Sequence, residues 1–251
     1  MESFSNFDNY QQAVIEPNHE NLPFQFHPKL IYAFVPQDKI EEFLDHHEHK
    51  IIGYFRSISF NPFIYEINIR NQKPTLCQAP LGAPAATQLL DWLTAYGVKK
   101  ILAIGNAGTL TDIAENKIMI PNKAIRDEGT SFHYLSSSQL VDLNSDYLNQ
   151  VKNQLKKMKI GYKEIITWTT DGFFRETPQK VALARNLGAS AVEMECAALA
   201  ACAQFRNVDF TQLLLTADTL VDESNYDERN WGYASYRKGI EIAAKILINI
   251  D

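Results

Sequence analysis

The sequence has little cysteine, no long hydrophobic run and no excess of basic charge, and each of these absences excludes a class of protein. Its three cysteines are odd in number and have no CxxC spacing, which does not suit a secreted disulfide framework and indicates a reducing, cytoplasmic environment. No apolar run approaches the roughly 18 residues that cross a bilayer, and the chain opens without a basic patch and apolar run, so we expect neither a membrane partner nor a secretory signal. Lys and Arg total 24 against 30 Asp and Glu, a net charge of -6 that argues against nucleic acid as a partner.

The usual glycine-rich phosphate loops are missing as well. The stretch Gly105-Asn106-Ala107-Gly108 matches neither GxGxxG nor the Walker motif. It is either a plain tight turn or a turn whose backbone N–H groups face an anion at the carboxyl end of a strand. Residues 45–49, Asp-His-His-Glu-His, are metal-binding types, but they fit the solvated end of an amphipathic helix and have no second ligand cluster. We therefore expect no metal.

What is present is enough apolar material for one sizeable core, since 45% of the 251 residues are hydrophobic. From about residue 29 onward, short β-rich segments alternate with segments of helical periodicity, and no repeat or linker divides them. We therefore predict a single-domain α/β fold over residues 29–251, a three-layer α/β/α sandwich around a central mixed β-sheet. Residues 1–28 are polar, lack periodicity and are predicted to form an irregular N-terminal arm.

β-branched and aromatic residues locate the expected strands, and Pro, Gly and capping residues locate the ends of the expected helices. Strands are expected at 30–35, 51–58, 63–69, 75–79, 100–104, 117–120, 165–169, 191–194 and 211–216. Helices are expected at 39–47, 84–96, 146–158, 178–186, 196–205 and 233–248.

Acidic residues follow two of the expected strands. Glu193 and Glu195 stand between an apolar strand and a helix of small residues. The helix dipole favours carboxylates at a helix start, which would explain both acids without a ligand. Two carboxylates at a sheet edge can also hold the vicinal hydroxyls of a sugar. Asp218 follows the apolar run 213–217, where desolvation would raise its pKa and let it donate a proton; a turn or N-cap aspartate is the alternative. Asp171 has the same two interpretations in a less apolar context.

An aromatic pair follows another expected strand. Phe173 and Phe174 come after Thr170-Asp171-Gly172. One ring could stack on a planar base while the other fills the core, although aromatic residues more often serve the core alone.

Taken in order, six motifs resemble the nucleoside phosphorylase superfamily, in the branch that holds hexameric purine nucleoside phosphorylases, uridine phosphorylases and methylthioadenosine/S-adenosylhomocysteine nucleosidases. The resemblance implies a nucleoside phosphorylase-like fold, a small-molecule nucleoside as substrate and no organic cofactor. The motifs are Gly82-Ala83-Pro84, Ile104 to Gly108, Pro121 to Tyr134 with Arg126 and Glu128-Gly129, Asp171 to Phe174, Val192 to Glu195, and Thr216-Ala217-Asp218.

The resemblance also implies roles for individual residues. Glu195, with Glu193 beside it, would bind the ribose hydroxyls, and Met194 would pack against the sugar. Phe173 would stack on the base, with Asp171 in the same element. Asp218 would protonate N7 of a purine with the help of Arg229, which stands in a Glu-Arg pair. The positions that mark uracil in the pyrimidine branch are Thr177 and Gln179 here, so uracil is disfavoured.

Family members complete each site with a neighbouring subunit, which implies a homo-oligomer that is at least dimeric and possibly hexameric. His19 in the N-terminal arm is the first candidate for the histidine supplied to the ribose 5′ side, with His27 second. Arg56 is a candidate for the arginine supplied to the phosphate.

The phosphate positions depart from the family pattern. Lys39 stands near the place of a family arginine, Ala103 replaces a second arginine, and Asn106 replaces a Ser or Thr beside Gly105. Exchanging a bidentate Arg for Lys or Ala weakens a pocket for a doubly charged anion.

The expected function is therefore cleavage of the N-glycosidic bond of a purine nucleoside in purine salvage. Phosphorolysis by a pentosyltransferase with inorganic phosphate as co-substrate is the leading hypothesis. Hydrolysis by water is an alternative, and a nucleoside-binding protein that has lost turnover is another.

Overall fold

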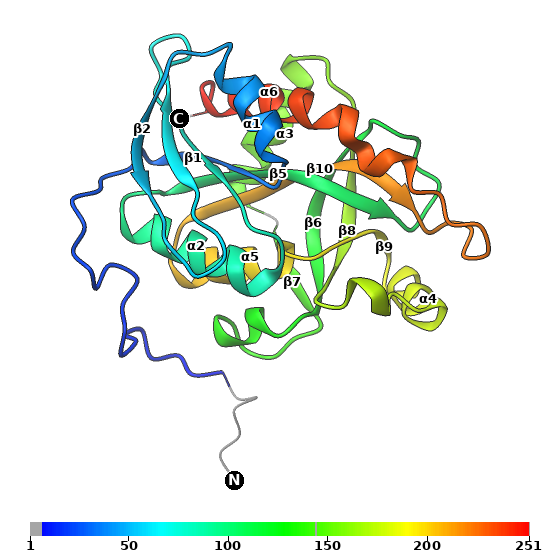
Figure 1. The fold of residues 1–251 in the computed structure, drawn as a ribbon. Helices are drawn as coiled ribbons and strands as arrows, with labels where there is room; N and C mark the ends of the chain where they lie inside the picture. The colour runs from blue at the N-terminus through cyan, green and yellow to red at the C-terminus, as the bar shows by residue number, and fades with distance from the viewer. Residues whose placement is uncertain (1–6, 144, 251) are drawn as a thin grey trace.

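The computed structural model describes residues 7–143 and 145–250, and in it a mixed ten-stranded sheet lies between two groups of helices (Figure 1). Helices α1 (Gln37–Leu44), α3 (Asp146–Lys157) and α6 (Tyr236–Leu247) cover one face, while α2 (Ala83–Ala95) and α5 (Cys196–Phe205) cover the other. The short helix α4 (Pro178–Asn186) lies apart from both groups and contacts β9 (Ala189–Glu193). This arrangement confirms the predicted three-layer fold.

The strands follow the order β10-β6-β8-β9-β5-β1-β4-β3-β2, and the short β7 pairs with β6. Parallel pairs join β1 to β4 and β5, and β5 to β10, whereas β2, β3 and β4 are joined by antiparallel pairs. The bounds are β1 Lys29–Ala33, β2 His49–Tyr54, β3 Phe63–Ile67, β4 Thr75–Gln78, β5 Lys100–Thr109, β6 Ile118–Asp127, β7 Leu140–Asp142, β8 Tyr162–Thr170, β9 Ala189–Glu193 and β10 Asp209–Thr219.

Half of the sheet closes on itself. Strand β10 pairs with β5 as well as with β6, and β6, β8, β9 and β5 are joined in series, so these five strands form a ring. Near the end of β5, Ala107 pairs with Thr216 of β10, and the next residue, Gly108, pairs with Val192 of β9. The closure therefore brings the carboxyl-terminal ends of β5, β9 and β10 together.

Helices α2 and α5 pack side by side on one face of the sheet, next to the ends of these strands. Helix α2 begins after Gly82, whose φ of 93° lies in the left-handed region that favours glycine, and Pro84 occupies its first turn. Helix α5 has the sequence CAALAACAQF, and eight of its ten residues are buried. Its small side chains let it lie close to α2 and to the ring of strands.

The described part of the N-terminal arm, residues 7–28, contains no helix or strand, and residues 1–6 lie outside the described residues. Phe24 and Phe26 pack against Trp92 of α2, with ring centroids 5.9 Å and 5.4 Å away. The backbone N–H of Phe26 donates to the carbonyl of Tyr96 at 2.8 Å. The end of the arm is thus fixed to α2.

Several boundaries predicted from the sequence are wrong. Residues 105–108 continue β5 rather than form a turn, because β10 and β9 hydrogen-bond to them on either side. Strand β10 extends to Thr219, so Asp218 lies within it rather than after it. Helix α6 begins at Tyr236 instead of 233, because residues 229–232 all have positive φ values, which a right-handed helix excludes. The three-residue strand β7 was too short to predict.

Candidate active site

A cavity of about 430 Å³ opens where the ends of β5, β9 and β10 meet. The segment after β8 and the turn before α6 close its sides. Its lining residues are Leu81, Asn106, Ala107, Gly108, Phe173, Phe174, Glu176, Val192, Glu193, Met194, Glu195, Ala217, Asp218, Trp231 and Tyr236. The ring closure therefore brings together six of the twelve predicted site residues, which are Asn106, Phe173, Glu193, Met194, Glu195 and Asp218.

Glu193 is buried, and both of its carboxylate oxygens are occupied by the protein. Oε1 accepts a hydrogen bond from the hydroxyl of Thr169 at 2.6 Å, and Oε2 accepts from the backbone N–H groups of Glu195 at 2.8 Å and Cys196 at 2.6 Å. These backbone donors belong to the start of α5, which a carboxylate stabilises. The expected contact of Glu193 with ribose is not supported, because its oxygens already fix the helix start.

Glu195 is buried as well, but it is positioned differently. Its Oε1 accepts a hydrogen bond from the backbone N–H of Gly82 at 2.6 Å, which joins the end of β9 to the start of α2. Burial, together with the nearby charge of Glu193, raises the pKa of Glu195. Met194 lines the cavity next to it. Glu195 is thus the acid of the pair that remains suited to a ligand.

Asp218 lies on β10 with its carboxyl group facing Gly108 of β5. A Cβ atom at Gly108 would lie 3.1 Å from Oδ1 and 3.2 Å from Oδ2 of Asp218, so a larger residue there would crowd this carboxyl group and displace it. The hydroxyl of Tyr226 donates a hydrogen bond to Oδ2 at 2.9 Å. Burial raises the pKa of Asp218 above that of an exposed aspartate, although the hydrogen bond from Tyr226 acts in the opposite direction. The group is therefore suited to hold a proton.

Aromatic rings form one wall of the cavity. Phe173 and Trp231 are half exposed, at 40% and 43%, and their ring centroids lie 5.9 Å apart. Phe174, at 92% exposed, lies outside them with its ring at 5.0 Å from Phe173. Trp231 sits in the left-handed turn 229–232, and Asn106 Nδ2 donates to its carbonyl at 2.7 Å. Such a wall can stack on a flat heterocycle.

Two further cavity residues carry no local signal in the sequence. Trp231 belongs to a loop that only the fold brings to Phe173, and Glu176 lies between Phe173 and helix α4. Four carboxyl groups consequently line the cavity, and no Lys, Arg or His is among the described residues that line it.

Some of the predicted site residues lie elsewhere in this chain. Asp171, His19 and Arg56 line a second hollow of about 690 Å³ between the N-terminal arm, α2 and residues 129–134. Oδ2 of Asp171 accepts a hydrogen bond from the backbone N–H of Gly129 at 2.9 Å. The expected contact of Asp171 with the base is not supported, because this carboxyl group faces the second hollow.

The predicted phosphate and helper cations are also engaged outside the cavity. Lys39 Nζ lies 2.6 Å from Glu42 Oε1 and 4.7 Å from the ring centroid of Tyr233. Arg229 donates to the carbonyl of Ile113 at 3.0 Å, although its charge still lowers the pKa of Asp218. Of the two residues predicted to bind phosphate at the end of β5, Gly105 packs against Phe34 and does not line the cavity. Asn106 does line it.

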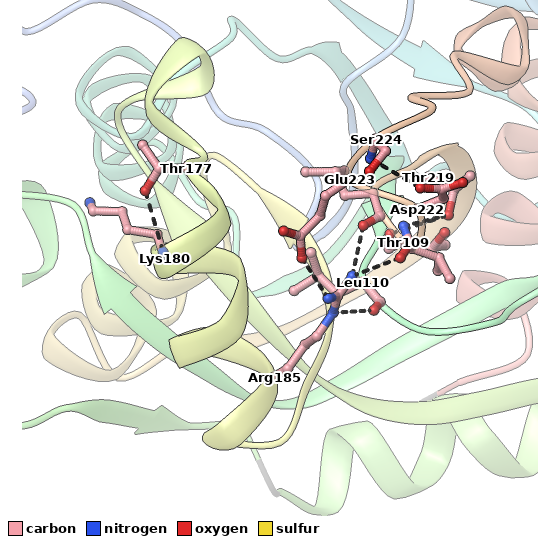
Figure 2. Close-up of polar contacts among 11 residues, drawn as sticks. Thr109, Leu110, Thr177, Lys180, Arg185, Thr219, Asp222, Glu223 and Ser224 are labelled. Carbon is pink, nitrogen blue, oxygen red and sulfur yellow. Dashed lines mark hydrogen bonds and ion pairs between the residues drawn. The ribbon is translucent and has the colours of Figure 1, made fainter.

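A polar cluster behind the cavity holds the loop that follows β10 (Figure 2). Arg185 of α4 donates to the carbonyl oxygens of Leu110 at 2.8 Å and Leu220 at 2.7 Å, and to Oε1 of Glu223 at 2.8 Å. One side chain therefore ties α4, the end of β5 and the loop that carries Tyr226.

The described residues offer neither a cluster of metal-binding side chains nor a membrane-spanning helix. Residues 7–143 and 145–250 contain no group of three or more His, Cys, Asp or Glu side chains that could hold a metal ion. Within the same ranges, no helix has both the length and the apolar character needed to cross a membrane.

Comparisons with known proteins agree with this geometry. The profile of the phosphorylase superfamily matches residues 31–249. The chain is 26% identical over 140 residues to the uncharacterized protein R802 of Acanthamoeba polyphaga mimivirus, and the matched region covers 55% of this chain and 54% of that protein. It is 29% identical over 169 residues to a DeoD-type purine nucleoside phosphorylase of Caldanaerobacter subterraneus, covering 65% and 73%. The fold is similar to a uridine phosphorylase of Vibrio fischeri with a TM-score of 0.75 and 20% identity, covering 94% and 95%.

Proposed function

Because the chain belongs to the phosphorylase superfamily, we propose that it is a nucleoside-cleaving enzyme that acts on the N-glycosidic bond of purine nucleosides. The observation that carries this proposal is the placement of Asp218 and Glu195 on one cavity beside the ring of Phe173. A proton donor for the leaving base, a carboxylate that can bind the sugar hydroxyls and a flat apolar wall for the base suit the cleavage of a bond between a sugar and a base, in which a nucleophile forms a new bond to C1′ of the sugar. The chain spans about half the length of the mimivirus relative, and this activity is proposed for the chain itself.

Asp218 acts as the general acid. As the glycosidic bond breaks, its electron pair moves onto the base, and a proton from Asp218 to N7 of the purine neutralises that charge. Burial keeps the carboxyl group protonated to a higher pH than an exposed aspartate would be. The Tyr226 hydroxyl then stabilises the carboxylate that remains.

Glu195 positions the ribose. Its carboxylate accepts hydrogen bonds from the vicinal hydroxyl groups, with Met194 beside the sugar. Hydrogen bonds from these hydroxyl groups, and the positive charge that develops on the ribose ring, favour the ionised form of Glu195 and act against the effect of burial on its pKa. Glu193 contributes indirectly, because its hydrogen bonds to the backbone of Glu195 and Cys196 hold the segment in place.

The nucleophile that attacks C1′ of the ribose is either phosphate or water, and one observation favours water. The cavity lining of this chain carries four carboxyl groups and, among described residues, no cationic side chain. A phosphate dianion would find no positive counter-charge there unless a neighbouring copy supplied a cation. Arg56 and His19 lie on the second hollow, so a homo-oligomer in which they reach the neighbour's cavity would restore a pentosyltransferase with phosphate as co-substrate.

A base-release assay tests the proposal. The purified protein is incubated with inosine, adenosine, guanosine and uridine, with and without inorganic phosphate, and the free base is separated and quantified. We expect purine release to exceed uracil release. Release that needs phosphate supports phosphorolysis, and release without it supports hydrolysis. Tight binding of a nucleoside with no release of base would instead support the binding-protein alternative.

A further inference from the structure

Glu176 is a carboxyl group on the proposed base side of the cavity for which the mechanism above has no use. It lines the cavity together with Asp218 and Phe173 and is half-buried. Its side chain makes no hydrogen bond or ion pair with any residue in the described part of the chain. A half-buried carboxyl group without a protein partner is costly, and a ligand that supplies a hydrogen bond would offset this cost.

The groups that face Glu176 are acidic or neutral. Asp218 from β10 and the Tyr226 hydroxyl from the following loop both interact electrostatically with it, and Glu193 and Glu195 line the same cavity. Burial and the charge of Asp218 raise the pKa of Glu176 to about 7. The carboxyl group therefore exists in both protonation states near neutral pH.

The backbone at Glu176 is held firmly. Thr177, the next residue, caps α4 by accepting a hydrogen bond from the backbone N–H of Lys180, and its own N–H donates to the carbonyl of Arg175 at 2.8 Å (Figure 2). Arg185 in turn fixes α4 to the loops after β5 and β10. The backbone position from which the Glu176 side chain enters the cavity is consequently set by the fold.

We infer that Glu176 determines base specificity, its carboxyl group contacting the 6-substituent of the purine so that the ionised form selects 6-amino and the protonated form 6-oxo nucleosides. This inference rests on the proposed function, in which Asp218 faces N7. N7 and the 6-substituent lie on the same edge of a purine, so a carboxyl group next to Asp218 meets the 6-substituent.

Hydrogen-bond chemistry gives the direction of the preference. An ionised carboxylate only accepts, so it pairs with a 6-amino group and repels a 6-oxo group. A protonated carboxyl group donates its O–H, which suits a 6-oxo group. Asp218 lies at the same edge of the base, so the difference between the wild type and a Glu176 variant, rather than the wild-type ratio alone, measures the contribution of Glu176.

The test compares adenosine with inosine. We expect the ratio of their kcat/KM values, adenosine over inosine, to rise by about tenfold between about pH 6 and about pH 8 in the wild type. In Glu176→Gln, whose amide both donates and accepts, the ratio should change by less than about twofold over the same range. Glu115→Gln, which removes an exposed acid outside the cavity, is the matched control and should behave like the wild type.

A binding measurement separates this inference from the proposed function. Calorimetric titration with free adenine and free hypoxanthine gives the same ratio without turnover. If neither nucleoside releases base but the binding ratio follows pH in the wild type and not in Glu176→Gln, the proposed function fails and the inference on Glu176 stands. If base is released but the ratio is independent of pH in the wild type, the inference is overturned, whether or not the variant folds.

Discussion

The hydroxyl group of Tyr226 donates a hydrogen bond to Oδ2 of Asp218 at 2.9 Å, and this contact joins the proposed general acid to the loop after β10. The hydrogen bond stabilises the carboxylate and so lowers the pKa of Asp218 against the effect of burial. The pH at which the acid works therefore depends on a residue outside the sheet.

Tyr226→Phe should shift the alkaline side of the pH profile. Without the hydrogen bond, the pKa of Asp218 rises, and a general acid loses activity as pH rises through its pKa. The fall of kcat/KM at high pH should therefore move upward, by about half a pH unit to one. Tyr233→Phe, which removes a hydroxyl bound to Asp38 outside the cavity, is the control. A shift to lower pH would contradict the assignment.

Asp218→Asn should abolish proton donation while keeping the shape of the side chain. We expect kcat for a purine nucleoside to fall by about 10²-fold or more, the usual scale of general acid catalysis, with substrate binding retained. Rapid-quench measurement of base release and calorimetric binding would separate the two quantities. A variant with unchanged kcat would remove Asp218 from the mechanism.

Glu195→Gln should affect binding as well as turnover. Loss of a charge-assisted hydrogen bond to ribose costs about 1.5 to 3 kcal/mol, which corresponds to roughly 10- to 150-fold in kcat/KM. The 2′-deoxynucleoside provides the matched comparison, because it lacks one of the hydroxyl groups. The variant and the wild type should differ less on that substrate, and an equal difference on both would argue against ribose recognition by Glu195.

The buried acids should make the protein less stable as pH rises. Burial raises the pKa values of Glu193 and Glu195, so above about pH 4.5, the ordinary pKa of glutamate, the folded chain binds more protons than the unfolded chain. The free energy of unfolding should then fall as pH rises from that value through neutrality. Thermal unfolding across this range should show a smaller slope for Glu195→Gln and an unchanged one for Glu115→Gln. A wild type that gains stability over the same range would refute the assignment.

Arg185→Met should loosen the loop after β10 while keeping the unbranched, apolar part of the side chain. The change removes hydrogen bonds to Leu110, Leu220 and Glu223 and leaves two partly buried carbonyl groups without that donor, at a cost of about 1 to 3 kcal/mol. Amide hydrogen exchange of residues 220–224 should become faster than in the wild type. Lys152→Met, which breaks a surface ion pair with Glu164, is the comparison and should leave that loop unchanged.

The sequence predicted the layers and most elements because both depend on local periodicity. The resemblance to the family assigned Glu195, Met194, Asp218 and Phe173 to one site, and in the structure these residues line one cavity. Their proposed roles remain predictions. The closure of the ring could not be predicted, because the pairing of β10 with β5 joins residues about a hundred positions apart.

The cavity residues that were missed come from loops. Trp231 and Tyr226 precede α6 in a segment with no periodic pattern, and Glu176 stands in the few residues between β8 and α4. Their positions depend on tertiary contacts such as that of Asn106 with the Trp231 carbonyl. Lys39, which the resemblance places near a family phosphate position, pairs with Glu42 in this chain, and its role as an anion ligand stays a prediction.

Helix α5 has little room for larger side chains. Its alanines and cysteines are buried among α2 and the ring of strands, and the backbone N–H groups of Glu195 and Cys196 at its start donate to the carboxylate of Glu193. Because protein interiors are close-packed, a larger side chain at Ala197, for example, would displace the helix rather than fit beneath it. Substitutions far inside the protein would thus alter recognition of the sugar, and a mutational scan should find α5 less tolerant of added volume than the aromatic wall.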